Sequence, residues 1–149
     1  MSFEDSPFPV RDAVTPPPPP DTRWLQTPVR AFMRPGVVTV AEDASLLQVQ
    51  RAMIAHGVHA VLITAVGGPI GWVTAGGLLP WLAKEPALYP ARTAITEQVA
   101  YIPPGASARE ALQALSASAV SHLLVSPRTV SSPQGVVSEI DLVRLASGG

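Results

Sequence analysis

Two kinds of apolar spacing alternate along this chain. In residues 46–56 the apolar side chains Leu46, Val49 and Met53 recur at helical spacing, so they would share one helix face. In residues 59–64 nearly every position is apolar, which is typical of a strand that is buried on both faces. The pattern therefore predicts an amphipathic helix followed by an interior strand.

Capping residues mark the ends of the elements predicted for the first half. Ser45 and Gln48 have the spacing of a capping box at a helix start, and Gly57 is suited to end that helix in the left-handed conformation. Thr27 followed by Pro28 is typical of an N-cap and a first helical position. The elements predicted for this half are a short helix from residue 28, strands over 37–40, 59–64 and 69–73, and helices over 46–56 and 74–83.

The same order of elements recurs in the second half. Ser107 and Glu110 form a second capping box, and Ala111, Leu112 and Leu115 follow it at helical spacing. Both halves have the order strand, helix, strand, strand, helix after a short helical segment, which predicts an α+β fold. The elements predicted for this half are a helical segment over 93–98, strands over 99–102, 122–126 and 134–137, helices after residue 107 and over 138–146, and a polar loop over 126–132.

Matching residues in the two halves keep a nearly constant separation. The two capping serines are 62 residues apart, His59 and His122 are 63 apart, and Gly71 and Gly135 are 64 apart. Small insertions in loops explain a drift of this size within a duplication. The chain is therefore predicted to contain one structural unit twice.

Composition excludes several functional classes. The formal net charge of −1 and the scattered basic residues argue against nucleic acid as a partner. The absence of cysteine excludes disulfides, thiol catalysis and cysteine-ligated zinc, and it is compatible with the reducing cytosol, so we expect a cytoplasmic location. No apolar run approaches the roughly 20 residues that cross a bilayer, and residues 1–10 lack the pattern of a signal peptide, so no membrane partner is expected.

The first 27 residues are predicted to form a proline-rich arm. Pro7, Pro9 and the proline run over 16–20 lack backbone donors and favour an extended polyproline II conformation. Two interpretations stay open for this arm. It is either a flexible leader, or a strap that docks on its own dimer or on a proline-recognising partner.

Candidate chemistry gathers where a strand passes directly into the last predicted helix. Ser138 is a good N-cap, and Asp141 stands three residues later, where its carboxylate can complete a capping box. The free N–H groups and the positive dipole end of a helix favour an anion or a sugar phosphate at this place. The matching positions in the first half are Thr74 and Gly77, so the carboxylate is missing there. A plain helix cap is the alternative interpretation.

The order of the elements and the motifs within them resemble a tandem pair of cystathionine-β-synthase (CBS) domains. In the first half the resemblance depends on residues 32–35 (Phe-Met-Arg-Pro), 38–40, 43–46 (Asp-Ala-Ser-Leu), 53, 57, 59–61 and 71–74. In the second half it depends on residues 101–103, 106–107, 111–112, 122–125 and 135–142 (Gly-Val-Val-Ser-Glu-Ile-Asp-Leu). The resemblance implies an arm over 1–27, a first repeat over 28–84, a connector over 85–92 and a second repeat over 93–149.

The resemblance implies a pseudo-symmetric module with two clefts, which pairs into a disc-like homodimer. Such clefts bind an adenosine compound such as AMP, ADP, ATP or S-adenosylmethionine. The Ser/Thr-x-x-Asp element would bind ribose through the carboxylate of Asp141, while Ser138 and the helix start would face phosphate. The site residues expected on this basis are Ser138, Asp141, Tyr101, Ala100, His122, Leu123 and Val137, with a weaker second cleft at Thr39, Ala60 and Thr74.

Two departures from the family pattern narrow this expectation. Gly77 removes the ribose carboxylate from the first repeat, so one competent cleft is expected, built mainly by the second repeat. Val58 and Ser121 stand where many nucleotide-binding members carry arginine. This difference favours AMP over di- and triphosphates, or no nucleotide at all.

For three individual residues the interpretation stays open. His122 either contacts phosphate or is a histidine with partners inside the protein, in the wall of the cleft or at the dimer interface. Tyr101 either stacks on a base or packs against the protein. Arg144, which follows Asp141 by one helical turn, is a solvated helix residue, an ion-pair partner or a phosphate contact.

These observations predict a non-enzymatic regulatory module that binds an adenosine-containing ligand and is read by an effector protein of unknown identity. The alternative is a ligand-free structural or interaction module that acts through its dimer surface and its proline-rich arm. The sequence has no nucleophile elbow and no phosphate-binding loop. His56 and His59 are separated by a helix-ending glycine, so no metal site is expected.

Overall fold

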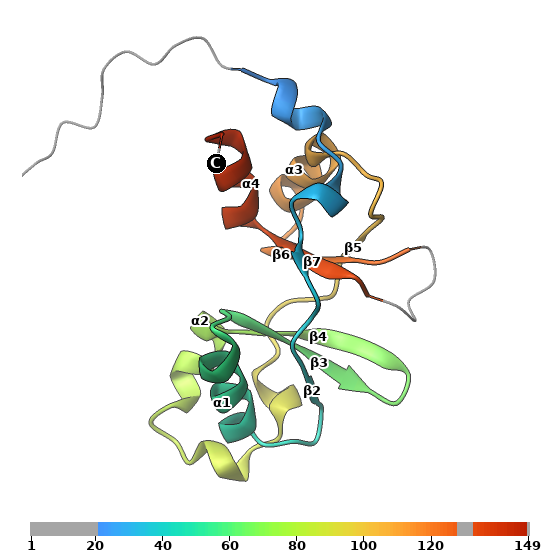
Figure 1. The fold of residues 1–149 in the computed structure, drawn as a ribbon. Coiled ribbons are helices and arrows are strands. Elements are labelled where there is room, and N and C mark those ends of the chain that lie inside the picture. Colours follow the sequence, from blue (N-terminus) through green and yellow to red (C-terminus); the bar gives the residue numbers. More distant parts are fainter. Residues whose placement is uncertain (1–20, 128–132, 149) are drawn as a thin grey trace, which may run out of the picture.

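The chain folds into two units that each combine a small sheet with helices (Figure 1). The structure is a computed structural model that describes residues 21–127 and 133–148. The first unit contains β2 (Thr39–Ala41), α1 (Leu46–His56), β3 (Ala60–Ala65), β4 (Gly68–Thr74), α2 (Ala75–Leu78) and the 3₁₀ helices η4 (Leu79–Trp81), η5 (Pro86–Leu88) and η6 (Ala91–Ala94). The second unit contains β5 (Tyr101–Ile102), α3 (Ala108–Ala117), β6 (His122–Val125), β7 (Gly135–Ser138) and α4 (Glu139–Ala146). The segment before β2 forms η2 (Arg23–Gln26), η3 (Val29–Ala31) and β1 (Arg34–Pro35).

Both sheets have the same arrangement of strands. In the first unit β2 is parallel to β3 and β3 is antiparallel to β4, and β5, β6 and β7 repeat this order in the second unit. Thr39 lies opposite Leu62 in one sheet, and Tyr101 lies opposite Leu124 in the other, so the paired residues are shifted by 62 positions. The α+β class and the duplication that residue spacing predicts are therefore confirmed.

The register corrects one detail of the predicted duplication. Ala60 lies opposite Thr74 at the start of β3, whereas His122 lies opposite Ser138 at the start of β6. The counterpart of His122 is therefore Ala60, and the counterpart of His59 is Ser121, so the match between the two histidines is wrong. Because the offset is 62 residues at β6 and 64 at β7, the two-residue insertion falls between these strands.

The segment that precedes each repeat packs on the other repeat. Arg34 of β1 pairs with Val136 of β7, so the second sheet takes its edge strand from the start of the chain. In the same way Glu97, which precedes β5 of the second sheet, pairs with Trp72 of β4 in the first sheet. Figure 1 shows the blue segment around η2 and η3 beside α3 and α4 of the second unit. Each repeat therefore packs its leading segment along the sheet of the other repeat, and this exchange joins the two repeats.

Two glycines allow these exchanged segments to approach the sheets closely. A Cβ atom at Gly135 would collide with the carbonyl oxygen of Arg34, and a Cβ atom at Gly71 would collide with the side chain of Ile95. Glycine in a strand commonly marks such a close approach of another backbone. Close packing against the exchanged segments therefore explains why glycine occurs at both matching positions, Gly71 and Gly135.

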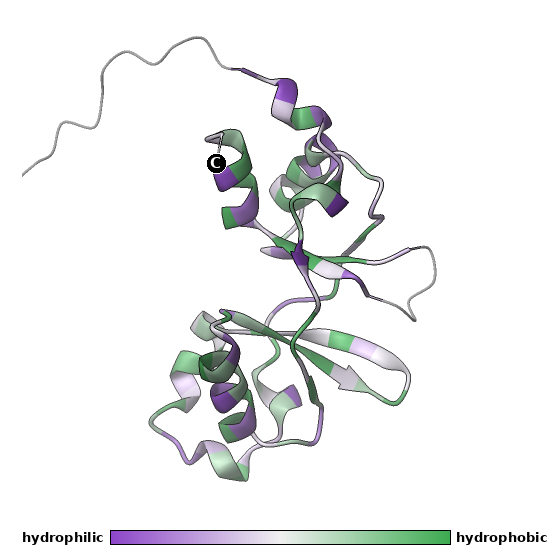
Figure 2. Cartoon of the chain, in the orientation of Figure 1, coloured by the Kyte–Doolittle hydropathy of each residue, from purple (hydrophilic) through white to green (hydrophobic). Residues whose placement is uncertain are grey.

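Buried side chains form a core in each unit and a small one between the two sheets. The core between the sheets consists of Ala60, Leu62, Trp72 and Leu124. Leu62 and Leu124 are fully buried, and Trp72 is 1% exposed. Figure 2 shows apolar residues along β3 and a mixture of polar and apolar residues on α1, as expected for an interior strand and a covering helix. This central core holds the two repeats against each other.

Helix ends agree with the sequence where capping chemistry sets them. Ser45 and Ser107 begin α1 and α3 with complete capping boxes, and Gly57 ends α1 with a φ of 61°. The long helix predicted over 74–83 is wrong, because α2 stops at Leu78 and a 3₁₀ turn with Pro80 follows. Gly76 and Gly77 also weaken this segment as an α-helix.

The short helical segments before the repeats are also different from the prediction. The segment after Thr27 is the three-residue 3₁₀ helix η3, and Pro28 takes the N-cap position that was predicted for Thr27. The segment predicted over 93–98 is instead the 3₁₀ helix η6, which ends at Ala94. The polyproline conformation of residues 1–20 and the loop at 128–132 lie outside the described residues.

Candidate functional site

A cavity of about 1030 Å³ lies where the two units meet. The first unit and its leading segment contribute residues 34–39, His56, residues 58–60 and Trp72. The second unit contributes Ser121, His122, Val136, residues 138–141 and Val143. Both repeats therefore build this cavity, which corrects the prediction of a cleft made mainly by the second repeat.

Five of the predicted site residues line this one cavity. Ser138, Asp141 and His122 were predicted for the main cleft, and Thr39 and Ala60 were predicted for a weaker second cleft. They meet because the start of β3 in the first repeat faces the start of α4 in the second repeat. The division of these residues between two clefts is therefore wrong.

The other predicted site residues do not line this cavity. Leu123 and Val137 are fully buried in the core of the second unit, and Ala100 packs against the same core. Tyr101 is 42% exposed on the edge strand β5. Because successive strand residues point to opposite faces, Leu123 cannot share the cavity face of its neighbour His122. Thr74 caps α2, where its Oγ accepts a hydrogen bond of 3.0 Å from the N–H of Gly77.

Asp141 is the buried acid of the cavity wall, with 4% of its surface exposed. Its Oδ2 accepts hydrogen bonds from the backbone N–H of Ser138 at 2.8 Å and from the Ser138 hydroxyl at 3.0 Å. Its Oδ1 accepts one from Nε of Arg34 at 3.2 Å and lies 3.6 Å from Nη1 of Arg144. The carboxylate is thus fixed at the start of α4 and paired with two guanidinium groups.

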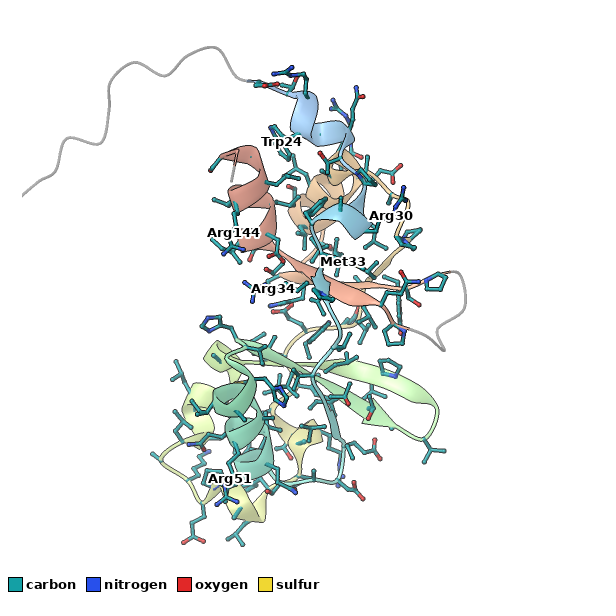
Figure 3. All side chains as sticks on the ribbon, viewed as in Figure 1. Trp24, Arg30, Met33, Arg34, Arg51 and Arg144 are labelled. Atoms are coloured by element: carbon teal, nitrogen blue, oxygen red, sulfur yellow. The ribbon has the colours of Figure 1, made fainter. Side chains whose placement is uncertain are left out.

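Arg34 lines the cavity and contacts Asp141, but it was not among the site residues predicted from the sequence. It lies in β1, on the segment exchanged between the repeats, and Figure 3 shows it at the junction of the two units, with Arg144 on α4. The sequence contained one signal, because Arg34 belongs to the Phe-Met-Arg-Pro motif of the family resemblance. Its approach to Asp141, 107 positions away, follows from the exchange of edges, which residue spacing does not reveal.

Ser121, His122 and Glu97 form a hydrogen-bonded group beside the cavity, and Ser121 and His122 line it. Ser121 donates to Glu97 twice, from its backbone N–H at 2.8 Å and from its hydroxyl at 2.7 Å. Its Oγ also lies 2.8 Å from Nδ1 of His122, whose ring packs against Trp72 with a centroid distance of 5.4 Å. Burial lowers the pKa of His122 below its ordinary value, and the nearby carboxylates, Glu97 first, oppose this shift. His122 is therefore expected to be neutral at pH 7.

Replacing His122 with glutamine should weaken the acid sensitivity of the fold. Because the pKa of His122 is lowered in the folded state, the unfolded chain binds more protons below about pH 6.5, and stability falls as the pH decreases. Urea unfolding at pH 7.5 and 5.5 measures this effect. We expect wild type to lose more unfolding free energy than His122→Gln between these pH values. An equal loss in both proteins would contradict the expectation.

The position related to this site by the repeat is built differently. Gly77 replaces Asp141, and a Cβ atom at Gly77 would lie 2.9 Å from the side chain of Thr96. The carboxylate of Glu97 accepts a hydrogen bond from the backbone N–H of Ser121, whereas the matching N–H of His59 has no partner among the described residues. The repeat-related position is therefore filled by the protein's own side chains.

A family comparison identifies the repeated unit. The CBS-domain model matches residues 29–84 and 91–148, which together cover most of the chain. The chain belongs to the CBS-domain family. The first match contains β2, β3 and β4 and the second contains β5, β6 and β7, so this is a tandem CBS-domain pair, as the sequence motifs predicted.

Solved structures of CBS-domain pairs share this fold. The CBS domain of a bacterial CNNM/CorC family Mg²⁺ transporter, in complex with an inhibitor, has a TM-score of 0.73 and 23% identity over 85% of this chain and 79% of its own. The same domain in complex with ATP has a TM-score of 0.71 and 22% identity over 84% and 90% of the two chains. A CBS-domain pair in complex with 5′-methylthioadenosine and S-adenosyl-L-methionine has a TM-score of 0.70 and 19% identity over 82% and 97%. A comparison with curated protein sequences gave no significant match.

Two negative findings apply to the described part of the chain. In residues 21–127 and 133–148, no helix has the length and apolar character that a membrane crossing requires. The same residues bring together no group of three or more His, Cys, Asp or Glu side chains that could hold a metal ion.

Proposed function

We propose that this CBS-domain pair is a non-enzymatic regulatory module that binds an adenosine-containing ligand, with AMP favoured, in the cavity between its repeats. The observation that carries the proposal is the buried carboxylate of Asp141 in the cavity wall at the start of α4. A carboxylate accepts paired hydrogen bonds from the two hydroxyls of a ribose. The adjacent helix N-terminus favours a phosphate group.

The comparisons support an adenosyl ligand as a class. One related structure is a complex with ATP, and another is a complex with 5′-methylthioadenosine and S-adenosyl-L-methionine. In this chain the N–H of His59 has no partner among the described residues and lies beside the cavity, where an adenine ring could use it. We favour AMP within this class because the cavity lining contains a single arginine, which suits one phosphate group better than three.

The proposed output is a change in how the repeats or two modules pack. The cavity is lined by both repeats, so a ligand that contacts both walls stabilises one relative arrangement over others. A module of this kind acts on an effector protein, and we propose a disc-like homodimer as the form that presents this surface.

Titration calorimetry with AMP, ADP, ATP and S-adenosylmethionine tests the proposal. We expect AMP to bind wild type and Asp141→Ala to bind it about 10- to 100-fold more weakly, because hydrogen bonds to a charged acceptor are lost. Glu110→Ala is the matched control, since Glu110 caps α3 in the same way but lies outside the cavity. Equal affinity in the Asp141 variant would refute the site, and no heat with any compound would refute the ligand class.

A ligand-free interaction module is the second candidate function. It is favoured by the fact that both oxygens of Asp141 already have partners within the protein, as expected for a purely structural cap. A thermal-shift panel separates the two functions, since a ligand at about 100 times its dissociation constant adds about 2.7 kcal/mol of stability. A flat response to every adenosyl compound would favour the interaction module.

A further inference from the structure

Arg34 has the position and the chemistry of an anion-binding residue. It lines the cavity next to Asp141, and its side chain is 47% exposed. We propose that Arg34 makes this site select adenosine ligands that carry a phosphate over neutral nucleosides. The inference rests on the proposed function and extends it by naming the residue that binds the phosphate group of the ligand.

The guanidinium group of Arg34 is only partly used within the protein. Its Nε donates to Oδ1 of Asp141 at 3.2 Å, and its two Nη groups have no partner among the described residues. Backbone pairing of β1 with Val136 of β7 holds the residue at the cavity. Unused donors on a fixed guanidinium suit the paired hydrogen bonds that phosphate oxygens accept.

Asp141 has little free capacity for a ribose in the present arrangement. Its Oδ2 already receives two hydrogen bonds from Ser138, and its Oδ1 receives the bond from Arg34, with Arg144 further away at 3.6 Å. A diol that donates to both oxygens therefore competes with Arg34 for Oδ1. Ribose binding would weaken this ion pair and leave the Arg34 charge in need of a new partner.

A phosphate on the same ligand supplies that partner. Arg34 is the single arginine or lysine among the residues that line the cavity, and the other charged groups there are the acids Glu139 and Asp141, apart from three histidines. Of these histidines, His122 has its pKa lowered by burial, which disfavours its charged form. An AMP molecule would thus replace the lost Asp141–Arg34 pair with a phosphate–Arg34 pair, whereas adenosine would leave the guanidinium without a counter-charge.

The test compares AMP with adenosine on three proteins by titration calorimetry. We expect wild type to bind AMP about 10- to 100-fold more tightly than adenosine. Arg34→Ala should reduce this ratio to near one, because AMP binding weakens while adenosine binding is unchanged or tighter. Arg144→Ala is the matched control, since Arg144 also pairs with Asp141 but does not line the cavity, and it should keep the wild-type ratio.

Each outcome bears on the inference. Because the ratio is taken within one protein, partial loss of folding in a variant affects both ligands alike. Equal affinity for AMP and adenosine in wild type would overturn the role of Arg34 and leave the proposed function standing. An equal loss of both ligands in Arg34→Ala would show that Arg34 only supports the fold. If wild type binds neither compound, the proposed function itself fails, and the inference fails with it.

Discussion

Replacing Trp72 with alanine is expected to lower the free energy of unfolding by about 3–5 kcal/mol, the range for large aromatic residues in cores. Trp72 is the largest side chain of the core between the two sheets, where it packs with Leu62 and Leu124. This core is small, so neighbouring side chains cannot close the space that alanine would leave. Urea unfolding followed by circular dichroism measures the change.

Phenylalanine at position 72 provides the matched control. The indole Nε1 of Trp72 is buried and has no hydrogen-bond partner among the described residues, and an unsatisfied buried donor costs about 1–3 kcal/mol. Trp72→Phe removes this donor and keeps an aromatic ring, so its cost should be far below that of Trp72→Ala. If both variants lose the same stability, the account of Trp72 as a filler of the central core is wrong.

The wild-type chain is expected to bind one AMP, and a rebuilt second cleft is expected to bind another. At the repeat-related position the acid is missing at Gly77, Thr96 fills the space beside it, and Glu97 occupies the N–H of Ser121. The triple variant Gly77→Asp, Thr96→Ala, Glu97→Ala supplies the acid, makes room for it and frees the N–H group. Calorimetry should then give two sites per chain instead of one.

The control for this experiment keeps Glu97 in place. The double variant Gly77→Asp, Thr96→Ala should still bind one AMP, because the carboxylate of Glu97 continues to accept the hydrogen bond from Ser121. Adding Asp141→Ala to the triple variant should weaken the original site and leave the new one. Two sites in wild type would show that the second cleft is not closed by these side chains.

Local chemistry explains which parts of the fold could be predicted. The capping boxes at Ser45 and Ser107 and the left-handed Gly57 act within a few residues of chain, so their elements begin and end as predicted. The second helix of the first repeat was predicted too long, because Gly76, Gly77 and Pro80 disfavour a continuous α-helix and a 3₁₀ turn follows Leu78. The short helical segments after Thr27 and over 93–98 were predicted, but their 3₁₀ form and their bounds were not, since segments of three or four residues have no spacing pattern of their own.

Only part of the candidate site could be predicted from the sequence. Ser138 and Asp141 were found because they form a local motif at one helix start. Tyr101 and Leu123 were assigned to the same cleft from the family resemblance, and the strand register places them elsewhere. Arg34 was missed, although it contacts Asp141 directly.

The sequence by itself determined that one α+β unit occurs twice, that helices in both units start at capping boxes, and that of the two repeats only the second carries the Ser-x-x-Asp motif, at residues 138–141. These properties depend on neighbours in the chain and on the periodicity of buried side chains. Only the tertiary structure decided that the leading segments are exchanged, that Arg34 joins Asp141, and that Thr39 and Ala60 share their cavity. Contacts between distant segments depend on strand pairing and register, which local patterns leave open.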